Sequence, residues 1–148
     1  MTSLKRNKER GFTIIELLIV IIVIGILATL VITTFSGIQR NARNRTREAD
    51  INALHSQLEF FYGNNDYYPT LAQLNDAAWR ADNMRGLDSE ALRDPQGAAA
   101  VIVSSPAAGS YAYVVLPADC NNTDEDCEEY TLTATLEGSD PFVKNSLN

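Results

Sequence analysis

The sequence has few of the residues that build catalytic and metal sites. Its 148 residues include only two cysteines and one histidine, His55. Two cysteines exclude a dense disulfide framework and a four-cysteine zinc site. A histidine without a companion predicts a residue on a helix surface rather than a ligand or a catalyst. The chain also lacks a G-x-S-x-G sequence and a Walker A sequence. We therefore predict that the protein is not an enzyme.

Positive charge is also scarce, and it is unevenly distributed. Twelve Lys and Arg residues oppose 19 Asp and Glu residues, for a formal net charge of −7, which argues against nucleic-acid binding through a basic surface. Residues 1–47 contain eight of the basic residues and two acids, a net +6, whereas residues 48–148 have a net charge of −13. This asymmetry predicts two parts that occupy two environments.

A long stretch lacks charge almost entirely. Between Arg10 and Arg40 the only charged residue is Glu16, and the 23 residues 17–39 carry no charge. A helix of this length can span a bilayer, and a chain of this size has no room to bury a helix that is apolar on every side. A secretory signal peptide is disfavoured because the apolar stretch is too long and no A-x-A-like cleavage site follows it. We therefore predict a transmembrane helix.

Charged residues at the two ends of this stretch need an explanation. A carboxylate within hydrocarbon costs about 2.5–3.5 kcal/mol, so Glu16 either lies near the interface and reaches water or pairs with a cation from another chain. Four arginines follow the stretch, and we interpret them as juxtamembrane or subunit-packing residues rather than nucleic-acid contacts. They are Arg40, Arg43, Arg45 and Arg47. Because basic residues flank both ends, the positive-inside rule leaves the orientation open.

The sequence GFTIIE at residues 11–16, between a short basic leader and an apolar run, resembles the class III signal peptide of the type IV pilins and type II secretion pseudopilins. The resemblance implies cleavage by a prepilin peptidase between Gly11 and Phe12, and N-methylation of the new Phe12 amine. It also implies that Glu16 neutralises the amine of a neighbouring subunit during filament assembly. One departure is Thr33, which stands where many type IVa pilins have a helix-kinking proline.

The same resemblance implies a function. We expect a structural subunit of a type IV pilus, with roles in adhesion, twitching motility or DNA uptake. One alternative is a pseudopilin of a type II secretion system, and another is a membrane-anchored binding module that does not polymerise. The implied partners are other copies of the chain, the prepilin peptidase, the assembly platform with its ATPase, and the membrane. The implied location is the cytoplasmic membrane, N-terminus inside, and then an extracellular pilus or a periplasmic pseudopilus.

The predicted fold is α+β, with a long N-terminal helix packed against a small antiparallel sheet. We divide the chain into a leader (1–11), a transmembrane and assembly helix (12–37), the amphipathic half of the same helix (38–63) and a globular head (64–148). The amphipathic half has Ile51, Leu54, Leu58 and Phe61 on one face. The segment GNND at residues 63–66 is expected to stop the helix as a C-cap and turn, so that the helix would cover residues 12–62.

The head is expected to begin with one short helix and to end with the sheet. Thr70 is placed to cap this helix, which would have Leu71, Leu74, Ala78 and Trp79 on one side. Residues 89–92 are placed to form a turn. Three runs have the composition of strands, residues 100–104, 110–116 and 129–136. In the last run the alternation predicts two faces. Tyr130, Leu132, Ala134 and Leu136 share one face, and Thr131, Thr133 and Thr135 share the other.

Cys120 and Cys127 enclose six residues in an acidic connection between the last two predicted strands. Outside the membrane, a disulfide between them is expected. The surrounding acids include weak candidates for a calcium site, because calcium prefers hard oxygen ligands. These candidates are Asp119, Asp124, Asp126 and Glu128. The spacing fails the EF-hand pattern, so we favour a solvated acidic loop and predict no cofactor.

Overall fold

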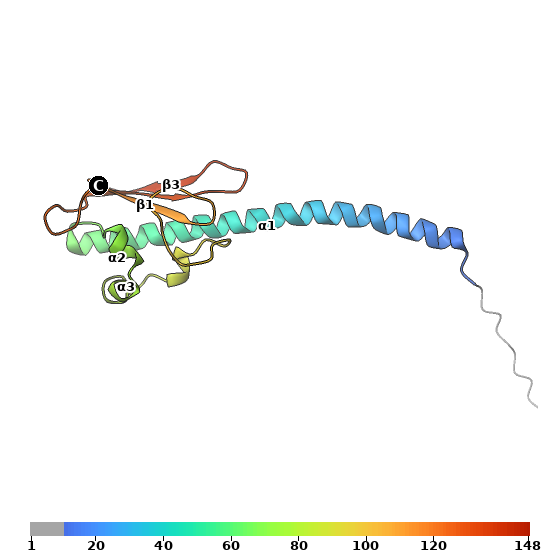
Figure 1. Ribbon diagram of the computed structural model, residues 1–148, viewed down its shortest axis with the longest axis horizontal. Coiled ribbons are helices and arrows are strands. Elements are labelled where there is room, and N and C mark those ends of the chain that lie inside the picture. The colour runs from blue at the N-terminus through green and yellow to red at the C-terminus, as the bar shows by residue number, and fades with distance from the viewer. Residues whose placement is uncertain (1–10) are drawn as a thin grey trace, which may run out of the picture. The chain divides into compact units, whose positions relative to one another are not determined.

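A computed structural model describes residues 11–148 of the chain. The residues divide into two compact units, which meet between Gln39 and Arg40. We call residues 11–39 the apolar unit and Arg40–Asn148 the globular unit. Helix α1, Ile14–Asn65, contributes residues to both. The remaining elements belong to the globular unit and follow α1 in the order of two short helices, a 3₁₀ turn and three strands (Figure 1).

The ends of α1 differ slightly from the prediction. The helix continues through Gly63 and ends at Asn65, within the segment expected to stop it but three residues later than predicted. The residue that leaves the helix is Asp66, which has a φ of 63° and whose N–H donates to the carbonyl of Tyr62 at 2.8 Å. Aspartate tolerates this left-handed conformation better than most residues, and Asn64 and Asn65 cap the preceding carbonyls with their side-chain amides.

The apolar unit exposes its side chains. Every large apolar residue from Phe12 to Ile38 whose surface is described is between 44% and 86% exposed. Two hydroxyls in the unit, those of Thr29 and Thr34, donate to carbonyls one turn earlier in the helix, so their hydrogen-bonding needs are met without water. By length and composition, the helix is able to cross a membrane.

The globular unit contains a three-stranded antiparallel sheet with the order β1-β2-β3. The strands are β1 (Tyr111–Leu116), β2 (Glu129–Ala134) and β3 (Phe142–Asn145). Tyr113 pairs with Leu132 across the first ladder, and Leu132 pairs with Lys144 across the second. The α+β fold and the number of strands are therefore confirmed, but one of the predicted strands is wrong and β3 was missed.

Residues 100–104 do not form a strand, although their composition suggested one. The Asn75 side chain forms hydrogen bonds with both backbone groups of Ile102. It accepts from the Ile102 N–H at 2.9 Å and donates to the Ile102 carbonyl at 2.8 Å. Within this run only Val103 pairs with the sheet, through an isolated parallel bridge to Ala112. The third position in the sheet goes to β3, a short strand whose Lys144 and Asn145 gave no hydrophobic signal.

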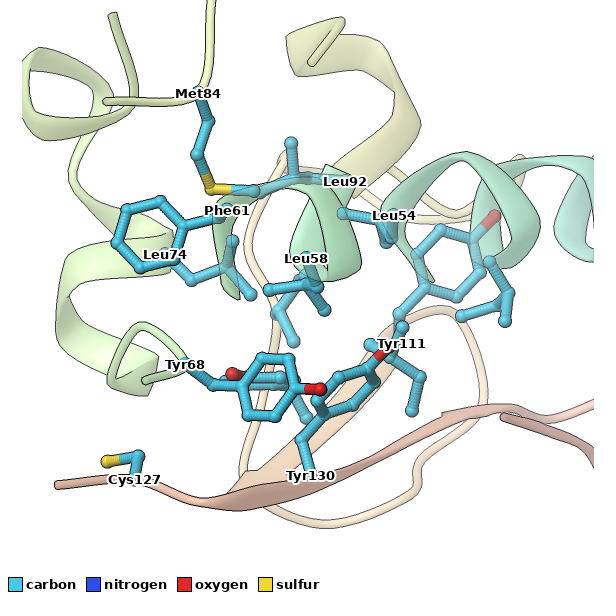
Figure 2. Close-up of a cluster of buried hydrophobic side chains, with 14 of the residues drawn as sticks. Leu54, Leu58, Phe61, Tyr68, Leu74, Met84, Leu92, Tyr111, Cys127 and Tyr130 are labelled. Atoms are coloured by element: carbon cyan, nitrogen blue, oxygen red, sulfur yellow. The ribbon is translucent and has the colours of Figure 1, made fainter. Parts of the chain in front are cut away.

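The core of the globular unit lies between α1 and the sheet (Figure 2). The predicted helix face of Ile51, Leu54, Leu58 and Phe61 is buried to 3% exposure or less. The predicted alternation in β2 holds in part, because Tyr130, Leu132 and Ala134 are buried, but Thr133 on the other face is buried as well. Leu136 lies beyond the end of the strand and is only partly buried. Aromatic rings fill much of the space, with Tyr68 and Tyr130 in an edge-on contact at 4.7 Å between ring centroids.

Two short helices, α2 (Leu71–Asn75) and α3 (Ala77–Asn83), connect α1 to the rest of the globular unit. Thr70 begins α2 with a capping box to Gln73, as predicted. The expected single helix becomes two because the side chain of Asp76 caps the start of α3, while its own N–H closes α2. The predicted turn is confirmed as the 3₁₀ element η1, Ser89–Leu92.

Candidate functional site

The start of α1 carries the residues that the sequence singled out for processing. Gly11, Phe12 and Thr13 precede the helix, and the Phe12 side chain is 77% exposed. The Gly11–Phe12 peptide bond is therefore outside regular secondary structure. Most of the leader predicted for residues 1–11 lies outside the described residues.

Glu16 has a partner within its own chain. Its Oε2 atom accepts from the Thr13 N–H at 2.9 Å and from the Thr13 hydroxyl at 2.6 Å. The Glu16 N–H in turn donates to the Thr13 Oγ1 at 3.3 Å. This is a capping box, which satisfies backbone donors at a helix start and places a carboxylate where the helix dipole favours it. The T-x-x-E spacing is visible in the sequence, but neither of the two interpretations of Glu16 from the sequence, at the interface or paired with another chain, included this capping box.

Two of the four arginines after the apolar stretch are paired with carboxylates of the globular unit. Arg47 is 1% exposed and donates to both carboxylate oxygens of Asp94, at 2.6 and 3.1 Å. It also donates to Glu137 at 2.9 Å. Arg43 makes a bidentate pair with Glu137, with both distances 2.6 Å. A subunit-packing role is therefore wrong for the buried Arg47, while the partly exposed Arg43 is paired within its own chain.

This guanidinium cluster joins three separate segments. Arg43 and Arg47 come from α1, Asp94 follows η1, and Glu137 follows β2. The two guanidinium groups hold the pKa of Glu137 down to about 2, and the carboxylates raise the pKa of Arg47. Asn44 adds two hydrogen bonds to the Glu137 backbone, one as a donor and one as an acceptor. The cluster therefore fixes the loops around the sheet against the helix.

A pattern in the sequence could have revealed this cluster. Arg43 and Arg47 precede Ile51 on the same helical face at a spacing of four residues. The buried face of α1 therefore begins with arginines, which require carboxylate partners when they are buried. The sequence does not show which of its 19 acids those partners are.

A second polar network connects the sheet to α1 through tyrosine hydroxyls. The Tyr111 hydroxyl donates to Asp50 at 2.6 Å. The Tyr130 hydroxyl lies 2.7 Å from Glu59 and 2.6 Å from His55 Nδ1. Burial raises the pKa of both tyrosines, and the adjacent carboxylates raise it further, so the hydroxyls stay protonated. His55 is only partly exposed and belongs to this network, so the expectation of a purely surface residue is wrong.

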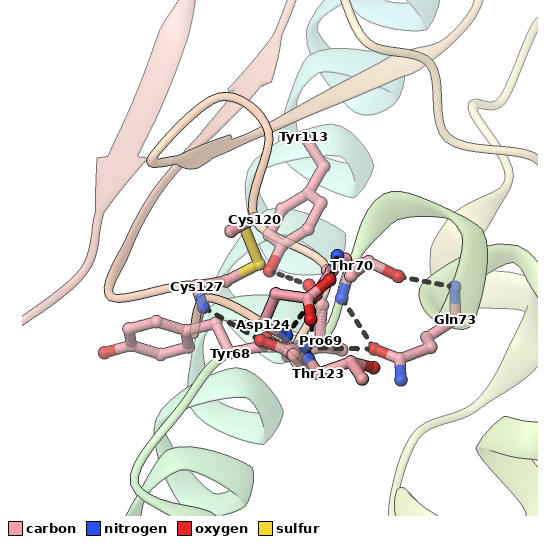
Figure 3. Close-up of a disulfide and its surroundings, with 11 residues drawn as sticks. Tyr68, Pro69, Thr70, Gln73, Tyr113, Cys120, Thr123, Asp124 and Cys127 are labelled. Carbon is pink, nitrogen blue, oxygen red and sulfur yellow. Dashed lines mark hydrogen bonds between the residues drawn. A yellow bond between two sulfur atoms is a disulfide. The ribbon is translucent and has the colours of Figure 1, made fainter.

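Cys120 and Cys127 form a disulfide, with 5.1 Å between their Cα atoms (Figure 3). The loop that it closes is joined to the segment after α1. The Tyr68 N–H donates to the Cys127 carbonyl at 2.8 Å, and the Asn122 amide donates to the Tyr68 carbonyl at 2.8 Å. The Tyr113 hydroxyl donates to the Pro69 carbonyl at 2.8 Å. The disulfide loop therefore secures the start of the connection between α1 and α2.

The acidic residues of the same loop are exposed and do not converge. Asp119, Asp124, Asp126 and Glu128 all face solvent. Within residues 11–148, no three or more His, Cys, Asp or Glu side chains are grouped as a metal site would require. Calcium takes six to eight oxygen ligands, so the loop as folded does not fit that ion. Asp124 instead accepts a hydrogen bond from Asn121 within the loop.

Two comparisons with known proteins, one with a family model and one with individual relatives, indicate the same family. A family model described as the prokaryotic N-terminal methylation motif matches residues 6–32. The type II secretion system core protein G of Escherichia coli is 32% identical over 114 residues, which are 71% of this chain and 79% of that protein. The core protein G of Dickeya chrysanthemi is 39% identical over 67 residues, 45% of this chain and 44% of that protein.

A relative with a different name is also similar. The type IV major pilin protein PilA of Myxococcus xanthus is 32% identical over 103 residues, which are 69% of this chain and 47% of that protein. No solved structure matches. The fold, the motif at the helix start and these relatives define a structural subunit rather than an enzyme. The chain belongs to the superfamily of type IV pilins and type II secretion pseudopilins.

Proposed function

We propose that the chain is a pseudopilin, a subunit of the short filament of a type II secretion system. The observation that carries this proposal is the similarity to the Escherichia coli core protein G, which extends over 79% of that protein. Relatives with the same name from several other genera support it. They favour the pseudopilin alternative over the type IV pilus subunit that we expected from the sequence.

The proposed maturation begins at the end of α1. Prepilin peptidase cleaves between Gly11 and Phe12, which removes residues 1–11, and the new Phe12 amine is methylated. The non-helical, exposed position of this peptide bond supports access by a peptidase. Residues 12–37 then act as the membrane and assembly helix, residues 38–63 carry the head, and residues 64–148 form it. The N-terminus is on the cytoplasmic side and the head is outside.

The exposed apolar side chains of the apolar unit support assembly from the membrane into a filament. A subunit can leave lipid only if an equally apolar surface replaces it, and the same helix on other copies provides such a surface. In this proposal Glu16 neutralises the amine of Phe12 on a neighbouring copy. Thr13 holds the carboxylate in position until that amine arrives. The assembly platform with its ATPase drives the process.

The test is a Glu16→Ala variant made in the producing organism. We expect normal insertion and leader removal but a strong loss of assembled filament and of protein secretion, because the partner for the incoming amine is gone. Intact mass of the membrane-extracted chain should show N-methyl-Phe12 as the first residue in the wild-type protein. Retention of Met1 in the wild-type protein, or normal filament yield from the variant, would contradict the proposal.

A type IV pilin remains the second candidate, and the similarity to the Myxococcus xanthus PilA favours it. The two functions differ in what is lost when the gene is deleted. Loss of protein secretion with intact surface pili supports the pseudopilin. Loss of surface pili, with adhesion, twitching motility or DNA uptake, supports the pilin. A binding module that does not polymerise would give neither loss and no filament.

A further inference from the structure

A groove of about 580 Å³ lies beside α1 in the globular unit. Its floor on the helix side is formed by small residues, Ala49 and Ala53. Its other wall is formed by the segment that contains η1 and ends at Pro95. The small side chains leave the space open, and all its lining residues belong to one compact unit of one chain.

Negative charge predominates in this groove. Its lining includes Asp50, Asp88, Glu90 and Asp94 but only one basic residue, Arg93. The negative charge of Asp94 is neutralised by its ion pair with the buried Arg47. The Glu90 and Arg93 side chains are 71% and 48% exposed and 3.8 Å apart, so their pairing is weak. Asp88 and Glu90 therefore present carboxylates to solvent at the mouth of the groove.

The excess of negative charge also acts on Asp50. Partial burial raises the pKa of Asp50, and the negative charges of Asp94 and Asp88 raise it further, against the lowering effect of the hydrogen bond from Tyr111. A carboxylate that is affected in this way gains from any cation that enters the groove. The chemistry expected of an occupant is therefore a positively charged side chain.

The chain itself provides such a side chain at Arg45. Arg43 and Arg47 are paired with carboxylates within the globular unit. The guanidinium group of Arg40 packs against Gly138, so closely that a Cβ atom added to this glycine would lie 3.0 Å from it. Arg45 lies two positions before Arg47, and so about 200° around the helix at 3.6 residues per turn. It is exposed, and it makes no ion pair in the described part of the chain.

We propose that the groove receives Arg45 of a second copy of this chain, so that Asp88 and Glu90 of one subunit hold the arginine of the next. The proposal rests on the proposed function, in which copies pack with their α1 helices side by side and parallel. Arg45 precedes Asp50 by five residues, which is about 7.5 Å along a helix. A neighbour displaced by that distance along the axis presents its Arg45 at the level of the groove.

Charge reversal in the full-length chain tests the contact. Arg45→Glu and Glu90→Arg should each lower the yield of sheared filaments roughly tenfold, because an attraction becomes a repulsion. The double variant Arg45→Glu with Glu90→Arg should restore most of the yield. Arg85→Glu and Asp82→Lys make matching charge changes at exposed positions outside the groove, and they should leave the yield unchanged.

Cysteine crosslinking identifies the second copy directly. Two differently tagged chains, one with Arg45→Cys and one with Glu90→Cys, are produced together and oxidised mildly. A mixed dimer should form, and it should be absent when Arg85→Cys replaces Arg45→Cys. The native disulfide does not interfere, because Cys120 and Cys127 are buried and paired.

Different results would overturn the proposed function and the proposed contact. If the wild-type chain forms no filaments, the proposed function is overturned and the contact falls with it. If wild-type filaments form but the single reversals do not reduce them, the contact alone is overturned. Failure of the double variant to restore the yield, or absence of the mixed dimer, has the same meaning.

Discussion

The apolar unit and the globular unit share helix α1 but differ in what covers its apolar side chains. In the globular unit Ile51, Leu54 and Leu58 are completely buried against residues of the same chain. In the apolar unit, side chains of the same types, such as Ile22 and Leu27, are more than half exposed. One unit therefore completes its own core, while the other needs a partner outside the chain, which lipid or other copies can provide.

This difference in burial predicts that substitutions in the two halves of α1 have different effects. Substitutions in the globular unit should change the free energy of unfolding of a single chain. Substitutions in the apolar unit should change insertion and assembly and leave that free energy unaltered. Trp79, which packs against Phe61 at 5.4 Å between ring centroids, provides a fluorescence signal for unfolding of the globular unit alone.

The largest expected effect is that of Arg47→Met. The substitution leaves the buried Asp94 without its counter-charge, so we expect a loss of about 3–5 kcal/mol in the free energy of unfolding. The measurement is denaturant unfolding of the full-length chain in detergent, followed by Trp79 fluorescence. Arg45→Met is the control at an exposed position, and it should change the value by less than about 0.5 kcal/mol. Equal effects of the two variants would contradict the assignment of Arg47 to the core.

Leu58→Ala and Ile22→Ala compare the two units directly. Leu58→Ala opens a cavity between α1 and the sheet and should cost about 2–5 kcal/mol. Ile22→Ala removes a similar side chain that is 52% exposed and lies in the apolar unit, so unfolding of the globular unit should not change. Both values come from the same fluorescence experiment. A loss from Ile22→Ala comparable to that from Leu58→Ala would abolish the distinction between the units.

Removal of the disulfide should have a moderate effect. A Cys120→Ser, Cys127→Ser double variant should lose about 2–3 kcal/mol, since a short closed loop no longer restricts the unfolded chain. Treatment of the wild-type chain with a reductant should produce the same loss, which separates the disulfide from the effect of the serines. Unchanged stability in both cases would show that the hydrogen bonds of Tyr68 secure the loop without the covalent bond.

The smallest expected effect is the contribution of Glu137 to the pH dependence of stability. Its pKa is about 2 in the folded chain and near 4.5 as a free side chain, because Arg43 and Arg47 favour its charged form. A lowered pKa means that stability is fully present above pH 4.5 and is lost as the pH falls toward 2. Thermal unfolding in that range should show a steeper fall for the wild-type chain than for Glu137→Gln. Parallel curves would contradict this role.

Local signals in the sequence were sufficient for the long helix, the capping of α2 by Thr70 and two of the three strands. Each depends on residues a few positions apart, such as the buried spacing of Leu54 and Leu58 or the alternation around Leu132. The prediction of a strand at residues 100–104 was wrong because the side chain of Asn75, distant in the sequence, forms hydrogen bonds with the backbone groups of Ile102. Such competition has no local signature.

The candidate site divides in the same way. Gly11, Phe12 and Glu16 lie within one short motif, GFTIIE, so the sequence alone singles them out, and their roles stay predictions. The cluster of Arg47 with Asp94 and Glu137 joins residues that are 47 and 90 positions apart. The periodicity of α1 could have placed the two arginines on the buried face, but only the folded chain selects their partners.

The tyrosine hydroxyls between the sheet and α1 have a mechanical consequence. Tyr111 and Tyr130 hold Asp50 and Glu59, which are nine residues and about 13.5 Å apart along the helix. A force along the axis of α1 acts on these hydrogen bonds and on the arginine pairs at Glu137 at the same time. The contact is then loaded in shear, and its bonds do not open one after another. Sliding by one helical turn, about 5.4 Å, would require all of them to break together. The head can therefore bear axial tension without separating from the helix that carries it.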